Sequence, residues 1–400
     1  MSDTRITGVT GGAHGLAATY AAVRHLADRF DDAGSELRDW SGLGVRTLGD
    51  PDLAASAPLS PLTFALAERA VLAATTGPDG VLVESLGWES DAVVVCEVVA
   101  MIDTCDDLVA FAFQPMTERL FAITGPERYS GLLALTYGGD GQPGVRHPAV
   151  EVPGSGEQPS DLAGLVGQLQ HVAALSQGSG SPLNGTVEVQ TIHGPDGVRH
   201  IVYLPGTDDM TTLPWTQDGD VRDLPTDLLL MAGQDNSYQQ GILQAMAQAG
   251  IGPHDPVLLV GHSMGGMEAA AILGQGGGGF HVTHIVTAGS PTAQVPSFPA
   301  GTHVLSLEHQ GDVVPHTDGA PNPDTVQQAT VTFADHGGAG GVVGDHDYWH
   351  YVNGAAAADA SADPSVQEQL ASLHESGFLA SGDGPGATVT SQVFQIVRAP

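Results

Sequence analysis

The sequence of 400 residues contains no lysine. All 12 of its basic residues are therefore arginine, and 46 acidic residues outnumber them to give a formal net charge of -34 at pH 7. A surface with this charge repels the phosphates of nucleic acids and the headgroups of anionic lipids. We therefore expect no nucleic-acid partner.

Cysteine and long apolar runs are also scarce. The two cysteines, Cys96 and Cys105, have a spacing that excludes the zinc and redox patterns, so we expect reduced core residues. The longest apolar stretch is interrupted by Glu97, Asp103 and Asp106, and no stretch reaches the length of a membrane span. The sequence predicts a soluble protein without stable membrane insertion.

The first residues lack the features of a conventional signal peptide. Met1 to Gly15 has neither a basic region nor an apolar region, which favours a cytoplasmic location. An alternative comes from Trp40-Ser41-Gly42, which we expect to end the first helix. It resembles the W-x-G turn of small helical-hairpin proteins exported by type VII secretion. The resemblance covers about one helix and a turn, and it keeps export without a conventional signal peptide open.

The N-terminal part of the chain has helical periodicity. Apolar residues recur at steps of three or four from Leu16 to Trp40, and similar patterns cover Pro61 to Ala74 and Asp91 to Phe113. The length and the 42% hydrophobic content suggest two domains. We predict a mostly helical domain at residues 1–150, whose role and partner the sequence does not indicate, and a catalytic domain at residues 151–400.

Strand and helix patterns alternate in the second part. After Asp161 to Leu175, which is either a linker or the first covering helix, the pattern continues with a hairpin and further strands. The predicted strands are Thr186 to Ile192, Arg199 to Leu204, Pro256 to Val260, His281 to Ala288, Val304 to Glu308 and Ala329 to Phe333, with a helix at Tyr238 to Gly250. This order predicts an α/β fold with a mainly parallel sheet covered by helices and ligands at the carboxyl ends of the strands.

One segment has the pattern of a nucleophile elbow. Gly261-His262-Ser263-Met264-Gly265 follows the apolar strand directly, and small helix-compatible residues follow it. A serine on such a cramped strand-to-helix turn projects its hydroxyl at the helix N-terminus, where backbone N–H groups can bind an oxyanion. Ser263 is therefore the predicted nucleophile.

The partners of this serine should follow it in the order acid, then base. Asp312 lies just beyond a strand and is the preferred acid, with Asp318 as its rival. His346 is the preferred base because it lies at the end of a Gly-rich segment before a run of aromatics. His350, one turn further on, and His336 remain alternatives.

Residues 185 to 355 resemble an α/β-hydrolase of the class 3 lipase type. The resemblance rests on the elbow and on three further segments in order: Ile201 to Thr207, Thr287 to Pro291 and Gly311 to Pro315, with His346-Asp347-Tyr348-Trp349 after them. It implies an oxyanion hole formed by Thr207 and the backbone N–H of Met264. Pro205 departs from the family, which has arginine before the glycine, so the support of this loop must differ.

These features predict a serine carboxylic ester hydrolase that needs no metal and no organic cofactor. The expected substrate is an ester or lipid-like small molecule. Asp208 to Ser237 is either an apolar lid over an acyl pocket or ordinary packing under a long loop. An acyltransferase or thioesterase on the same fold, and a non-catalytic interaction protein, are the alternative functions.

Overall fold

The computed structural model divides the chain into two compact units, Met1–Leu16 with Pro115–Pro400 and Ala17–Gln114. We describe residues 4–77, 80–89, 91–92, 95–96, 140–150, 152–176, 181–209, 212, 217–231, 233–293, 295, 297–318, 320–335, 344–380 and 387–399. The smaller unit is shorter than the helical domain expected at residues 1–150. The segments Arg5–Gly11 and Gln142–Arg146, at the two ends of that range, are strands of the sheet in the larger unit.

The smaller unit is helical. It contains α1 (Leu16–Leu48), α2 (Pro51–Ser56) and α3 (Pro61–Thr76). Trp40-Ser41-Gly42 lies inside α1, so the turn expected there is wrong. A glycine within a helix costs only about 1 kcal/mol and does not end it. The helix ends instead just before Pro51, and the carboxylate of Asp50 accepts hydrogen bonds from the first backbone N–H groups of α2.

Two other expectations concern this unit. Cys96 is a free thiol and is exposed, so the prediction of a core cysteine is wrong for it. Cys105 lies outside the described residues, as does most of the helix expected at Asp91 to Phe113. None of the helices that we describe combines the length and the apolar content that crossing a membrane requires.

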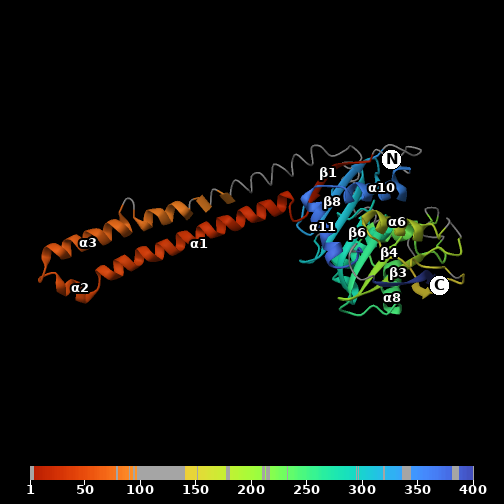
Figure 1. The fold of residues 1–400 in the computed structure, drawn as a ribbon, viewed down its shortest axis with the longest axis horizontal. Helices are drawn as coiled ribbons and strands as arrows, with labels where there is room; N and C mark the ends of the chain where they lie inside the picture. The colour runs from red at the N-terminus through yellow and green to blue at the C-terminus, as the bar shows by residue number, and fades with distance from the viewer. Residues whose placement is uncertain are drawn as a thin grey trace. The chain divides into compact units, whose positions relative to one another are not determined.

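The larger unit is built on a nine-stranded sheet in the order β1-β8-β7-β6-β5-β4-β3-β9-β2. Figure 1 labels β1, β8, β6, β4 and β3, which follow one another in this order across the sheet. The strands are β1 (Arg5–Gly11), β2 (Gln142–Arg146), β3 (Thr186–Gly194), β4 (Gly197–Leu204), β5 (Pro256–His262), β6 (His281–Ala288), β7 (His303–His309), β8 (Gln328–Ala334) and β9 (Thr388–Ala399). Strands β4 to β8 pair in parallel, which confirms the predicted parallel sheet at its centre.

Antiparallel strands complete both margins of this sheet. At one edge β1 pairs with β8, and at the other β4 is followed by β3, β9 and β2. The sequence patterns did not identify β1, β2 or β9. For β9 a local signal was present and was overlooked, because TVTSQVFQIV is rich in β-branched residues.

Helices cover both faces of the sheet. One core contains side chains from α6 (Leu162–Ala173), α10 (Tyr348–Asp359) and α11 (Pro364–Glu375), and the other contains side chains from α8 (Ser237–Gln248) and α9 (Met264–Gly274). The remaining elements are α7 (Leu224–Met231), η1 (Gly277–Gly279), η2 (Val314–His316) and η3 (Gly344–His346). Because α6 packs on α10, the segment after residue 160 is a covering helix rather than a linker. Its N-terminus is held by Asp359, which accepts hydrogen bonds from Leu162 N and Ala163 N at 3.0 Å each.

Candidate active site

The turn between β5 and α9 is sterically constrained. Ser263 has φ 53° and ψ -124°, and it is the one non-glycine residue with positive φ among those described. A Cβ atom on Gly265 would lie 1.9 Å from Leu204 O, and one on Gly261 would lie 2.3 Å from the carbonyl carbon of Gly265. Both flanking positions therefore require glycine, because helix and strand approach each other too closely for any side chain.

The hydroxyl of Ser263 remains available for chemistry. It makes no capping hydrogen bond to the backbone of α9, although Ser263 occupies the N-cap position of that helix. The Ser263 N–H donates to Ala288 O at 2.9 Å, which extends the β5–β6 pairing up to the elbow. The serine is thus fixed at the carboxyl end of the central strand, beside the positive end of a helix dipole.

The structure brings His346 and Asp312 together. His346 ends η3, Asp312 follows β7, and His346 Nδ1 donates to Asp312 Oδ2 at 2.6 Å. The same oxygen accepts a hydrogen bond from the hydroxyl of Tyr351 at 2.5 Å, and Asp312 Oδ1 accepts one from Val314 N at 2.9 Å. The carboxylate is buried and fully engaged, so it can orient the His346 ring and stabilise its charged form.

The alternative residues have other partners. His350 Nδ1 contacts Asp335 rather than Asp312, at 2.7 Å from Oδ1. Asp318 Oδ2 accepts a hydrogen bond from Ala293 N at 2.8 Å. His336 lies outside the described residues.

His262 links the elbow to His346. Its Nε2 lies 3.0 Å from His346 O, and the two rings are 4.5 Å apart. Burial lowers the pKa of His262 well below its usual range, and the nearby His346 lowers it further. The His262 ring is therefore neutral, and its Nε2–H donates to the backbone of the predicted base. The ring of Tyr348 packs against His262 at 3.9 Å and extends this aromatic contact.

Three residues outside the loop at Gly206 and Thr207 support it. Gly206 N donates to the hydroxyl of Tyr348 at 2.9 Å, and Gly206 O accepts from Arg222 at 3.1 Å. Thr207 Oγ1 donates to Asp227 Oδ2 at 2.8 Å. Burial raises the pKa of Asp227 to about 7. Arg222 thus takes over a supporting role beside Pro205, and no local motif in the sequence indicated it.

The segment from Asp208 to Ser237 is anchored in its described part. The guanidinium of Arg222, which is completely buried, pairs with Asp208. Arg398 in β9 pairs with Asp223 at 2.8 Å and donates to the backbone oxygen of Asp220. These buried ionic contacts fasten Asp208 and residues 220–223, so this described part of the segment is packed and is not a free flap.

An apolar cavity of about 220 Å³ lies beside α9. Met267, Ala271 and Gly274 lie on one face of this helix and form one side, beginning one turn beyond Ser263. Leu230 and Met231 at the end of α7 also line it. The cavity can accommodate a hydrocarbon group near the elbow.

Part of the larger unit is similar to a known protein family. Residues 236–358 match the family described as PGAP1-like alpha/beta domain. A solved structure, the Lip2 lipase from Yarrowia lipolytica, aligns with 12% identity and a TM-score of 0.23 over 43% of this chain and 80% of that chain. No curated protein matches the sequence significantly. The sheet order, the elbow and the family match identify an α/β-hydrolase-type fold with an additional N-terminal helical region.

Helix α9 also contains a buried acid. Glu268 is fully buried, and its Oε2 accepts a hydrogen bond from Gln239 at 3.1 Å. Burial raises the pKa of Glu268 to about 8, and this hydrogen bond offsets only part of the shift. The carboxyl is therefore protonated in the folded protein at neutral pH.

This acid should make stability depend on pH. The pKa of Glu268 rises from 4.5 to about 8 on folding, so its contribution is complete below pH 4.5 and is lost as the pH rises towards 8. Over this window the free energy of unfolding should fall by up to about 1.4 kcal/mol per pH unit from this group. Urea titrations between pH 5 and 9 would measure the slope, and Glu268→Gln should reduce it. An equal slope in the variant would contradict the assignment.

Proposed function

We propose that this α/β-hydrolase-type protein is a serine carboxylic ester hydrolase that acts through an acyl-enzyme on Ser263. The observation that carries the proposal is the strained serine at the elbow with an Asp312–His346 pair on the following loops. Strain of this kind costs about 1–3 kcal/mol, and residues that carry it cluster at active sites. A packing role for the turn would not need a serine in that conformation.

The hydrogen bond between His346 and Asp312 supports one assignment of the proton path. His346 Nδ1–H is committed to Asp312, so Nε2 is the atom that accepts the proton from Ser263 Oγ. The serine oxygen then forms a bond to the ester carbonyl carbon, and His346 returns the proton to the departing alcohol. Water repeats the same steps on the acyl-enzyme and releases the acid.

The oxyanion would be held by backbone N–H groups. Met264 begins α9 immediately after the nucleophile, where its N–H lies at the positive end of the helix dipole. Thr207 would supply the second donor from the opposite loop. Because its hydroxyl donates to Asp227, we assign that donor to the backbone N–H of Thr207 and a holding role to its side chain.

The cavity beside α9 supports an acyl group as the part of the substrate that is buried. Its walls are mainly apolar, and it begins one turn from Ser263. The net charge of -34 disfavours anionic lipid surfaces, so neutral esters are the preferred substrates.

The first test replaces the nucleophile. Ser263→Ala should reduce kcat on p-nitrophenyl esters by at least about 10⁴-fold and abolish labelling by a fluorophosphonate, with an unchanged circular dichroism spectrum. Peptide mapping of the labelled wild type should locate the phosphonate on Ser263. Labelling at another residue, or activity above a few per cent in the variant, would refute the serine mechanism. A wild-type protein that never reacts would instead support the non-catalytic alternative.

The second test concerns the base. His346→Ala should lose about as much activity as Ser263→Ala, because members of a triad act as a unit. Asp312→Asn should also lose activity, since the His346 ring would no longer be held in the correct tautomer. His350→Ala should remain at least about 100-fold more active than His346→Ala by the same assay. The reverse order would transfer the role to His350.

The third test concerns chain length. Wild-type kcat/KM should rise from acetate towards medium-chain p-nitrophenyl esters, since each buried methylene contributes about 0.8 kcal/mol. Ala271→Leu narrows the cavity two turns from Ser263 and should lower kcat/KM on octanoate about tenfold. Acetate hydrolysis serves as the internal control and should be unchanged. An optimum at acetate in the wild type would rule out the acyl assignment of this cavity.

A further inference from the structure

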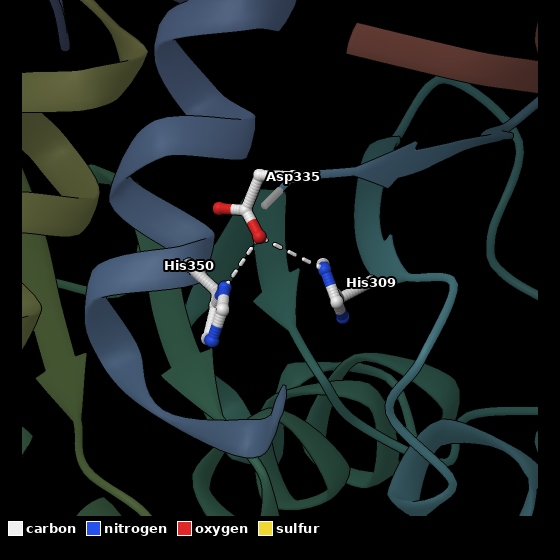
Figure 2. A group of neighbouring side chains, drawn as sticks. All are labelled: His309, Asp335 and His350. Atoms are coloured by element: carbon white, nitrogen blue, oxygen red, sulfur yellow. Dashed lines mark hydrogen bonds and ion pairs between the residues drawn. The ribbon is translucent and has the colours of Figure 1, made fainter. Parts of the chain in front are cut away.

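A second group of imidazoles around a carboxylate lies at the carboxyl ends of β7 and β8. Figure 2 shows Asp335 between His309 and His350, with one carboxylate oxygen directed at both rings. His350 Nδ1 lies 2.7 Å and His309 Nε2 lies 3.1 Å from Asp335 Oδ1. The Asp335 side chain is completely buried, and both histidine side chains are at most 5% exposed.

Asp335 and His350 lie on either side of the proposed base, His346, in the sequence. Asp335 directly follows β8, His350 lies in the first turn of α10, and His346 comes between them. The hydrogen bond between Asp335 and His350 therefore joins the two ends of the segment that carries His346. Joining the ends of a segment reduces the number of conformations open to it.

His309 connects the three side chains to the turn that carries the proposed acid, Asp312. It is the last residue of β7, three residues before Asp312. Its Nδ1 accepts a hydrogen bond from Gly311 N at 3.2 Å, and its backbone oxygen accepts one from Asp312 N at 3.0 Å. Both the side chain and the backbone of His309 therefore accept hydrogen bonds from the turn that leads to Asp312.

The three side chains could also be ligands of a metal ion, since their donor atoms lie within 4.8 Å of one another. The hydrogen bonds favour a different role. Because His309 Nδ1 accepts from a backbone N–H, the proton of the neutral ring is on Nε2, the atom that would have to bind the metal. Asp335 Oδ2 is also engaged, by Asn353 at 3.4 Å. The carboxylate is satisfied by N–H donors alone.

We propose that His309, Asp335 and His350 form a buried hydrogen-bonded clamp that positions Asp312 and His346 relative to each other. The clamp residues act through the acid and the base and do not touch substrate. The proposal rests on the catalytic roles assigned to Ser263, Asp312 and His346, so its test needs a readout that does not depend on ester hydrolysis.

Amide variants separate hydrogen bonding from other roles of the imidazoles. Asparagine at 350 places its Nδ2 where His350 has Nδ1, and glutamine at 309 places its Nε2 where His309 has Nε2. His350→Asn and His309→Gln should therefore keep kcat within about threefold of the wild type. His350→Ala and His309→Ala should lower kcat about 10- to 100-fold with little change in KM, because a displacement of about 1 Å has an effect of this size.

His284 provides the matched control. Like His350, it is a buried histidine with a hydrogen-bonded ring. It lies on β6, and its Nε2 is hydrogen-bonded to Ser372 at 2.9 Å, away from the proposed catalytic residues. His284→Ala should lower the Tm by an amount similar to His350→Ala but leave kcat unchanged. If His350→Ala fails to fold, Asp335→Asn retains the shape and removes the charge, and it should lower kcat instead. Equal losses of kcat in His284→Ala and His350→Ala would show a general effect of stability and overturn the clamp.

The readout independent of hydrolysis is the His346 Nδ1–H proton resonance, measured on ¹⁵N-histidine-labelled protein in the Ser263→Ala background and assigned with His346→Gln. We expect the resonance in this background and with His350→Asn, and its loss by solvent exchange with His350→Ala. Persistence in His350→Ala would overturn the clamp even if the hydrolase assignment holds. Loss of activity in His350→Asn equal to that in His350→Ala, with zinc stimulating the wild type, would replace the clamp by a metal site.

Discussion

The close approach of α9 to β4 and β5 is the constraint on which the rest of the larger unit depends. It leaves no room for a side chain at Gly261 or Gly265, and it holds Ser263 in a conformation that non-glycine residues rarely adopt. The packing that enforces this conformation comes from the buried apolar faces of β4, β5 and α9. The free energy of that core offsets the local strain at the serine.

The loops beside the elbow are fixed by buried polar side chains that form ion pairs and hydrogen bonds. Arg222 and Arg398 are paired with buried aspartates, and Tyr351 donates to Asp312. Buried polar groups are tolerated when their hydrogen bonds are satisfied, and they then fix one geometry in preference to others. The chain has only 12 basic residues, and two of them, Arg222 and Arg398, pair with aspartates in the segment between β4 and α8.

Local sequence patterns predicted those helices and strands whose conformation depends mainly on neighbouring residues in the chain. His281–Ala288 was predicted to the residue, because its apolar run is a local signal. Contacts across long separations could not be predicted. Tyr348 lies 142 residues from Gly206, and Tyr351 lies 39 residues from Asp312. The Trp40-Ser41-Gly42 turn was wrong because a short motif competes poorly with the helical propensity of its neighbours.

The strand order has a consequence for how the chain is made. β9 lies between β3 and β2, although more than 180 residues separate it from β3 in sequence. Until β9 has left the ribosome, β3 exposes a row of unpaired backbone groups along one side, which is a template for pairing with other chains. Contacts this distant also form slowly. A sheet that formed before β9 joined it would therefore expose this edge of β3 to pairing with other chains.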